Sequence, residues 1–319
     1  MDAITQNELI LDEPLPLDQN PAAVYVASLP ADSGKRTQAQ ALRVIAGTLG
    51  TDVNRLKWSA LRYQYTTAIR SRIAASYSPA SANKILSALR QTLKQAWLLG
   101  QMSADDYRRA IELEPITGET IPAGRELSTG EILALMTACQ ADTSKAGTRD
   151  AAIIGLMYAA GLRRQEIVSL TIASFEAETG KLTLTGKRNK QRTAYLTNGA
   201  LDAMNDWLTI RGYEPGALFV AINKGGKLDT SKAIDPQAIY NMTFKRANQA
   251  GVKNFSPHDM RRTFVSDLLD KGADISTVAK MAGHASVQTT ARYDRRPEEA
   301  KRKAASLLHV PYKKRTAGA

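Results

Sequence analysis

Apolar residues in the first third of the chain recur at the spacing of amphipathic helices. Ile85, Leu89 and Leu93 follow one another at intervals of four, so they share one face of a helix. The same periodicity predicts four helices, over residues 36–49, 58–77, 82–98 and 103–111. Four helices without an intervening strand indicate a small helical bundle.

The segments on either side of this block lack the helical pattern. Residues 1–34 contain several prolines and six acidic residues but no lysine or arginine, so we expect a flexible or loosely docked acidic leader. Residues 116–124 are rich in turn-forming residues and predict a linker. The chain therefore divides into a helical domain at 35–115 and a second domain at 125–319.

The second domain combines two periodicities. Residues 181–185 and 192–196 alternate like strands on either side of a turn at 186–190. Ser128 and Glu131 have the spacing of a capping box before an apolar run. Further helices are predicted over 148–160, 236–250, 257–271, 275–282, 287–292 and 297–308. We therefore expect a mainly α protein with a small antiparallel β-sheet, in which the second domain is mixed α/β.

The charge of the chain indicates a class of binding partner. The net charge is +12, and both domains are basic behind the acidic leader. Such blocks favour a polyanion, because each neutralised phosphate releases condensed counterions, although solvated lysine-rich faces give the same composition. Acidic residues occupy the N-terminus where a secretory signal needs positive charge, and the apolar run at 151–162 is too short to span a bilayer. We expect a cytoplasmic protein without a membrane partner.

Five short segments of the second domain carry the candidate chemistry. They contain, in order, Arg163 with Glu166, the basic turn with Lys187, Arg188 and Lys190, then His258 with Arg261, then His284, and finally Tyr293. Each segment alone has an ordinary explanation, such as a helix-start ion pair, a solubilising turn or a capping histidine. Cys139 stands in an apolar stretch, and we expect it to be a small buried side chain on a helix.

Order and spacing together change that interpretation. Gly-Leu-Arg-x-x-Glu, Gly-Lys-x-Asn-Lys-x-Arg, His-x-x-Arg, Gly-His and Tyr closely resemble the catalytic domain of tyrosine recombinases (phage integrases), over residues 125 to about 310. The helical block before them is similar to the core-binding domain of that family. The resemblance implies a two-domain site-specific recombinase, similar to those that resolve chromosome dimers. Such an enzyme cleaves and rejoins DNA without ATP, through a 3′-phosphotyrosyl intermediate.

The residue types suit cleavage of a phosphodiester. Arg163 and Arg261 can neutralise its two non-bridging oxygens with permanently charged, forked donors. The resemblance makes Tyr293 the nucleophile, and His258 is the candidate base because a tyrosine hydroxyl is mostly protonated at neutral pH.

The remaining roles follow from the resemblance. A hairpin lysine protonates the leaving 5′ oxygen; Lys187 fits that place best, although Lys190 lies on the same turn. His284 donates a hydrogen bond to the phosphate, and Glu166 orients Arg163 or a histidine. Basic residues elsewhere are candidates for DNA contact: Arg62, Arg70, Arg72, Arg188, Lys190 and Arg192.

No metal or other cofactor is expected. His258 and His284 could form a zinc pair, but only His309 remains as a third histidine and no cysteine partner is available. Two alternatives are a type IB topoisomerase and a catalytically silent DNA-binding protein of the same fold. The His-x-x-Arg and Gly-His motifs favour a recombinase over the first, and the occupied catalytic positions argue against the second.

The resemblance also implies an assembly on double-stranded DNA. Recombination exchanges strands between two duplexes, so a homotetramer on paired sites is expected. Residues 297–309 form an amphipathic pattern, and we expect this C-terminal helix to dock onto a neighbouring protomer, with docking on its own domain as the alternative. The acidic leader is a candidate site for a hetero-partner.

Overall fold

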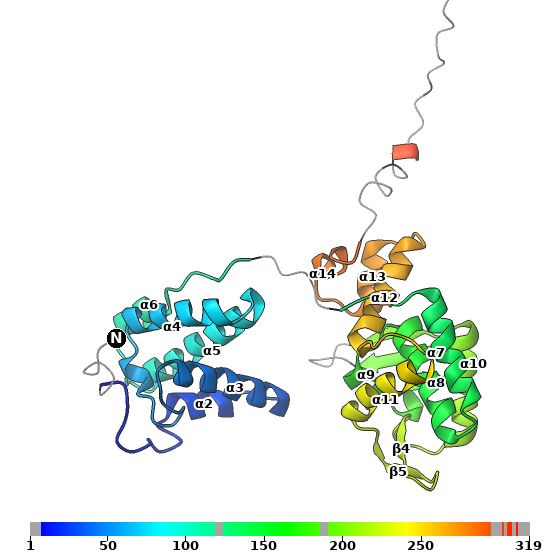
Figure 1. Cartoon of the computed structure of the whole chain (residues 1–319), viewed down its shortest axis with the longest axis horizontal. Coiled ribbons are helices and arrows are strands. Elements are labelled where there is room, and N and C mark those ends of the chain that lie inside the picture. Colours follow the sequence, from blue (N-terminus) through cyan, green and yellow to red (C-terminus); the bar gives the residue numbers. More distant parts are fainter. Residues whose placement is uncertain are drawn as a thin grey trace, which may run out of the picture. The chain divides into compact units, whose positions relative to one another are not determined.

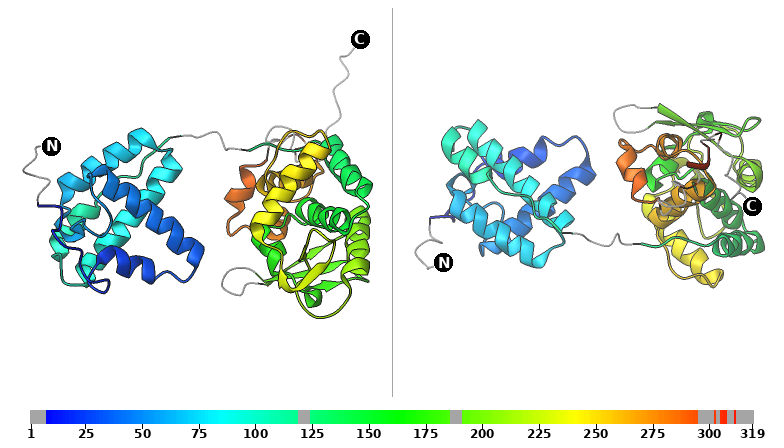
Figure 2. Two further views of the ribbon diagram at one scale, coloured as in Figure 1. Left: turned by 60° about the horizontal axis from the view of Figure 1, so that its bottom comes forward. Right: turned by 90° about the horizontal axis from the view of Figure 1, so that it is seen from above.

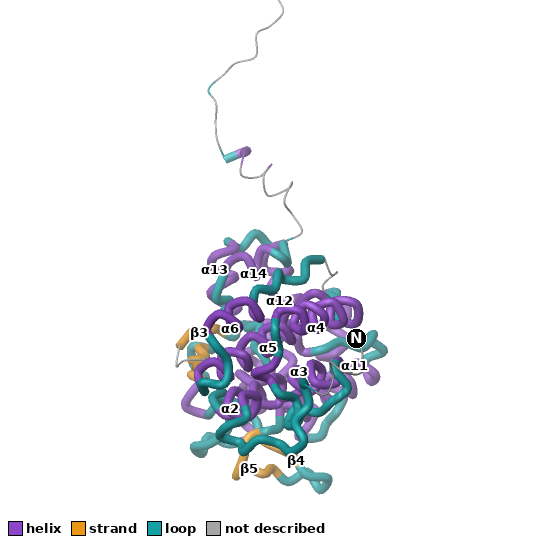
Figure 3. Tube along the Cα trace, turned by 90° about the vertical axis from the view of Figure 1, so that its left-hand side faces the viewer, coloured by secondary structure: helices purple, strands orange, loops and turns teal. Residues whose placement is uncertain are grey.

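The computed structural model describes residues 8–118, 124–185 and 191–294, together with residues 302, 305–307 and 311. The chain divides into two compact units, Met1–Pro122 and Ala123–Ala319, and this division falls within the predicted linker. The described elements are mainly helices, with a few short strands (Figures 1 and 3), as the predicted fold class requires. None of the described helices combines the length and apolar character that a bilayer-spanning segment needs.

The N-terminal unit is a helical bundle around one long helix. Its α-helices are α2 (Pro21–Ala27), α3 (Asp32–Thr48), α4 (Tyr63–Ser76), α5 (Pro79–Leu98) and α6 (Ala104–Ile111), with a 3-10 turn η1 (Trp58–Ala60) before α4. Helix α5 buries Leu86, Leu89 and Leu93 completely, and every other helix of the unit contributes to the same apolar core. The predicted stripe on residues 82–98 is therefore the centre of this domain.

Of the two possibilities expected for the leader, flexible or loosely docked, the described part is docked on the bundle, and flexibility is wrong for it. Helix α2 lies within residues 1–34, with Asn20 as its N-cap and Pro21 in its first turn, a favourable start for a helix. Leu9 and Tyr25 are buried in the core of the unit, and Ile10 forms an isolated β-bridge with Leu56. These few apolar residues are sufficient to dock the segment on the bundle.

The C-terminal unit surrounds the buried helix α8 (Lys145–Ala159), whose residues from Ala151 to Met157 are all buried. Helices α7 (Thr129–Ala141), α10 (Asn198–Arg211) and α12 (Pro257–Asp270) pack directly against it. Helix α11 (Pro236–Gln249) packs against α7 and α9 (Arg164–Ser169), and α13 (Ile275–Ala282) packs between α12 and α14 (Val287–Ala291). The predicted capping box of Ser128 and Glu131 opens α7, and Cys139 is buried on the same helix, as predicted.

Two small antiparallel sheets lie along one side of these helices (Figure 2). The first has the order β1 (Phe175–Glu176), β2 (Lys181–Thr185) and β3 (Gln191–Tyr195), and Leu184 pairs with Arg192 in its register. The second consists of β4 (Val220–Ile222) and β5 (Leu228–Ala233), a hairpin at the edge of the unit (Figure 1). Strand β3 of the first sheet contacts α13, and this contact brings Arg192 close to that helix.

Candidate active site

The first element of the site is the turn between α8 and α9. Gly161 has a φ of +60°, and a Cβ atom there would overlap the ring of Phe264, so this turn needs glycine. Arg163 follows as the N-cap residue of α9. Its backbone N–H donates to Glu166 Oε2 at 2.8 Å, and its Nη1 donates to Glu166 Oε1 at 2.9 Å. The Arg163 side chain remains 46% exposed, so its guanidinium is available at the surface.

Glu166 joins two arginines, one of which had a different predicted role. Arg192 Nη2 donates to Glu166 Oε2 at 2.8 Å, and Arg192 Nη1 donates to the Met281 carbonyl at 2.7 Å. Burial tends to raise the pKa of Glu166, but the Arg163 N–H and the charges of both arginines outweigh it and lower that pKa. Arg192, predicted as a DNA contact, is thus turned inward against a carboxylate and a backbone carbonyl.

Helix α12 supplies His258 and Arg261 from one face of its first turns. Pro257 stands at the first helical position, and Ser256 with Asp259 caps the helix. Arg261 is only 3% exposed, and its guanidinium donates to the carbonyls of Gly161 and Ala282. Burial, with a smaller contribution from the nearby charge of Arg163, lowers the pKa of Arg261 to about 10. The group therefore remains charged at neutral pH.

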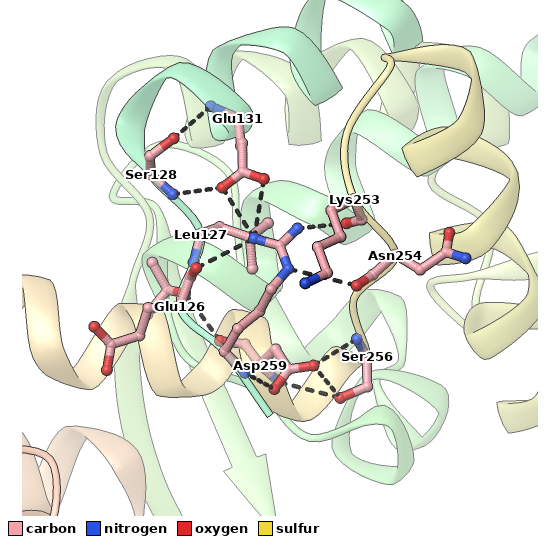
Figure 4. A network of polar contacts seen from close by, with 10 residues as sticks. Glu126, Leu127, Ser128, Glu131, Lys253, Asn254, Ser256 and Asp259 are labelled. Carbon is pink, nitrogen blue, oxygen red and sulfur yellow. Dashed lines mark hydrogen bonds and ion pairs between the residues drawn. The ribbon is translucent and has the colours of Figure 1, made fainter. Parts of the chain in front are cut away.

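The start of α12 is anchored to the first residues of its own unit (Figure 4). Asp259 accepts hydrogen bonds from the backbone N–H groups of Ser256 at 2.8 Å and Arg125 at 3.0 Å. The Arg125 guanidinium forms an ion pair with Glu131 at 2.9 Å and donates to the Lys253 carbonyl. These bonds fix the turn that carries His258, and none of the five sequence motifs indicates them.

His284 and Tyr293 come from the segment after α13. Gly283 ends that helix in the left-handed conformation, with a φ of +64°. His284 Nδ1 lies 2.8 Å from Thr290 Oγ1, and its ring stacks with Tyr293 at a centroid distance of 6.3 Å. The Arg262 guanidinium lies over the Tyr293 ring, 5.6 Å from its centre. Arg262 was missed because only its neighbour Arg261 belongs to the recognised motif.

Electrostatics favour neutral imidazoles at this site. Burial lowers the pKa of His258, with smaller contributions from Arg261 and Arg262. Burial, together with the nearby charges of Arg261 and Arg163, lowers the pKa of His284 to about 4. Both histidines are therefore uncharged at neutral pH, each able to accept a proton at one ring nitrogen and donate one from the other.

The structure brings together the predicted arginine, histidine and tyrosine residues of the C-terminal unit. It does not place every predicted residue: Lys187, Arg188 and Lys190 lie outside the described residues. Within the described part of the chain, no group of three or more His, Cys, Asp or Glu side chains could hold a metal ion. The arrangement can bind an anion through two guanidinium groups and present a phenol hydroxyl and two neutral imidazoles beside it.

The remaining DNA-contact candidates belong to the N-terminal unit. Arg62 pairs with Asp106 at 3.2 Å, and Arg70 donates to the Glu114 carbonyl at 2.8 Å. Arg72 donates to the Thr48 carbonyl. Arg62 also lines a hollow of about 690 Å³ between the start of α4 and the side of α6. All three arginines thus bond to their own unit, and their predicted contact with DNA stays a prediction.

Comparison with known proteins gives an independent result. Residues 125–299 match the model of the phage integrase family. Among curated proteins, tyrosine recombinase XerD of Lacticaseibacillus casei is 32% identical over 224 residues, which cover 68% of this chain and 72% of that protein. Tyrosine recombinase XerC of Corynebacterium efficiens is 33% identical over 198 residues, which cover 61% of this chain but only 60% of that protein.

Solved structures agree on the fold. XerH site-specific recombinase bound to palindromic difH substrate has a TM-score of 0.65 at 19% identity, with 95% of this chain and 92% of that chain covered. The Tn1549 transposon integrase in complex with transposon right end DNA has a TM-score of 0.67 at 13% identity, with 92% and 99% covered. At such low identity the similarity concerns the architecture.

Proposed function

Since the chain belongs to the phage integrase family, we propose that it is a site-specific DNA recombinase that forms a 3′-phosphotyrosyl bond through Tyr293. The observation that carries this proposal is the convergence of Arg163, Arg261, His258 and His284 on the segment that holds Tyr293. Arg163 and Arg261 donate to the carbonyls of Gly283 and Ala282, the two residues before His284. The His284 ring stacks with Tyr293, and His258 lies on the same helix as Arg261. Double-stranded DNA is the proposed substrate.

The proposed role of each side chain follows from its charge and its position. Attack on a phosphodiester builds negative charge on the non-bridging oxygens, and we assign its stabilisation to Arg163 and Arg261. Neutral His258 takes the proton from the Tyr293 hydroxyl, a role that its lowered pKa favours because an imidazolium could not accept it. His284 donates a hydrogen bond to the phosphate while Thr290 fixes its ring.

A lysine of the 186–190 turn is the proposed general acid, with Lys187 preferred over Lys190. The leaving 5′ oxygen needs a proton, whereas a thiolate leaves without one. A substrate with sulfur at the 5′ bridging position should therefore rescue cleavage by Lys187→Ala. Rescue of Lys190→Ala instead would assign the role to Lys190.

Neither nucleotide nor metal takes part in the proposed reaction. The phosphotyrosyl bond conserves the energy of the broken phosphodiester, and a 5′ hydroxyl from another strand attacks it to rejoin the DNA. Cleavage should therefore persist in excess EDTA and without ATP. An absolute requirement for Mg²⁺ at the cleavage step would contradict the mechanism.

The decisive experiment traps the covalent intermediate on a nicked suicide substrate. The wild-type protein should form an adduct, and Tyr293→Phe should bind the same DNA with nearly unchanged affinity but form none. Adducts that persist in this variant would exclude Tyr293 and direct attention to Tyr195 or Tyr240. A two-site recombination assay beside a supercoil-relaxation assay distinguishes recombinase from topoisomerase activity.

We further propose that residues 35–115 serve as the core-binding domain, and that four protomers assemble on paired sites. The C-terminal segment 297–309, which lies outside the described residues except 302 and 305–307, is assigned to docking in trans. Truncation after Arg296 should leave a folded, DNA-binding monomer that recombines poorly. Recombination at the full rate would show that the segment is dispensable, and unfolding would favour docking in cis.

A further inference from the structure

Arg192 occupies a central position between two parts of the site that come from different segments of the chain. Its side chain is only 16% exposed, although it belongs to a short edge hairpin. One guanidinium nitrogen donates to Glu166, which also holds Arg163, and another donates to the Met281 carbonyl, three residues before His284. Arg192 is thus a direct connection between the Arg163 turn and the His284 segment.

Gly283 provides a second, independent indication of this connection. A Cβ atom at Gly283 would lie 2.7 Å from Arg192 Nε and 3.1 Å from Arg192 Cδ, so the bare backbone gives room for the arginine. The Gly283 carbonyl in turn lies 3.5 Å from Arg163 Nη2. The glycine before His284 therefore serves two purposes, because it ends α13 with a positive φ and lets Arg192 lie against the backbone.

We propose that Arg192 is a positioning residue that fixes the distance between Arg163 and His284, and that it does not contact DNA. The proposal rests on the recombinase function proposed above. Both terminal nitrogens of Arg192 donate to protein acceptors, as those of Arg261 also do, but only Arg192 has its charge balanced by an ion pair with a carboxylate, whereas Arg261 meets two neutral carbonyls. A guanidinium fork suits this work because its planar donors can hold two acceptors at a fixed separation.

Removal of Arg192 has two local consequences. Glu166 loses one of the two arginines that bond to its carboxylate, and the Met281 carbonyl loses a donor. Both the Arg163 turn and the His284 segment then have more freedom. Because misplacement of reacting groups by about 1 Å can cost about 100-fold in rate, we expect a loss in catalysis without a loss in binding.

The test uses full-length Arg192→Ala in single-turnover cleavage of a suicide substrate at saturating DNA, beside the dissociation constant at several salt concentrations. We expect the cleavage rate to fall about 10–100-fold. The slope of log Kd against log salt should stay unchanged, whereas loss of a phosphate contact reduces it by about one. Arg192→Lys should recover only part of the rate, since one ammonium group cannot reproduce the fork.

Arg164→Ala is the matched control. Arg164 is a neighbouring arginine that bonds to the Pro236 carbonyl at 3.4 Å and stacks over Tyr240, away from Glu166, so its loss should leave the cleavage rate near that of the wild type. A double-mutant cycle with Glu166→Gln should show strong coupling to Arg192→Ala, because both changes break the same connection.

Each result decides the matter. A reduced salt slope with an unchanged cleavage rate would make Arg192 a DNA contact and overturn the proposal, as would full recovery by lysine or additive effects with Glu166→Gln. If Arg192→Ala is unfolded, as judged by its thermal unfolding, then Arg192→Lys and a double-mutant cycle of Arg192→Lys with Glu166→Gln decide instead. Absence of adducts from the wild-type protein would instead reject the recombinase function itself.

Discussion

Arg261 and Arg163 serve the same proposed phosphate, but the protein holds them in different ways. Arg261 lies in the interior, where the carbonyls of Gly161 and Ala282 receive its guanidinium. Arg163 lies at a helix start with an exposed guanidinium, and a side chain, Glu166, holds it. The position of Arg261 is therefore set by the course of the backbone, whereas that of Arg163 depends on an ion pair that one substitution can remove.

The largest expected effect is the direct loss of either arginine. Arg163→Ala and Arg261→Ala should each lower the cleavage rate by about 10²–10³-fold, the usual value of a donor aimed at transition-state charge. Single-turnover adduct formation measures this, and DNA affinity at moderate salt is the control. A loss confined to affinity would move the arginine concerned to DNA binding.

Gly161→Ala should disturb Arg261 without touching its side chain. Alanine at this position would have to adopt a strained φ of +60°, and its Cβ would overlap the ring of Phe264. The turn, whose carbonyl accepts a hydrogen bond from Arg261, must therefore shift. We expect a loss of stability of about 1–3 kcal/mol together with slower cleavage. Thermal unfolding and adduct formation measure the two effects, with Gly199→Ala as a control because a Cβ there meets no atom within 4 Å. Unchanged stability would show that the turn is more adaptable than this packing implies.

Glu166→Gln tests the support of Arg163 in the same indirect way. A neutral amide still accepts a hydrogen bond but loses the attraction to Arg163 and Arg192. We expect cleavage to slow about tenfold, less than for Arg163→Ala, because the arginine remains present though less well placed. Equal losses for both variants would mean that Glu166 does more than orient its neighbour.

The sequence predicted most of the elements whose apolar residues form a clear stripe, and it missed several others. Helix α2 has only seven residues, too few for a clear period, and prolines and acids surround it. Helix α10 was also not predicted, although Met204, Trp207 and Leu208 are buried at helical spacing. The β4–β5 hairpin was missed because polar residues dominate β5, which has no buried position.

The site shows the same division. The candidate reactive side chains could be selected, because their order along the chain forms motifs. Their supports could not, since the carbonyls of Gly161, Ala282 and Met281 are groups that every residue possesses. Which carbonyl faces an arginine depends on tertiary packing, and for this reason Arg192 was assigned to DNA.

The smallest expected effect is a shift in the pKa of His284. It serves to compare the electrostatic influence of Arg261 with that of Arg163. Burial is the main cause of its pKa of about 4, and the charge of Arg261 lowers it more than that of Arg163. Removal of a positive charge favours the imidazolium, so the pKa should rise in both alanine variants and rise further in Arg261→Ala. It should stay below the ordinary value of about 6.5 in each, because burial persists. Nuclear magnetic resonance of the imidazole C–H protons, assigned with His284→Gln, measures these values. A larger rise in Arg163→Ala than in Arg261→Ala would mean that the exposed arginine, not the buried one, dominates the potential at the imidazole.

The lowered pKa of His284 also predicts how stability depends on pH. Between about pH 6.5 and 4 the unfolded chain binds a proton at His284, whereas the folded chain does not, so the free energy of unfolding should decrease as the pH falls through this range. His284→Gln should weaken this dependence, which thermal unfolding at several pH values measures.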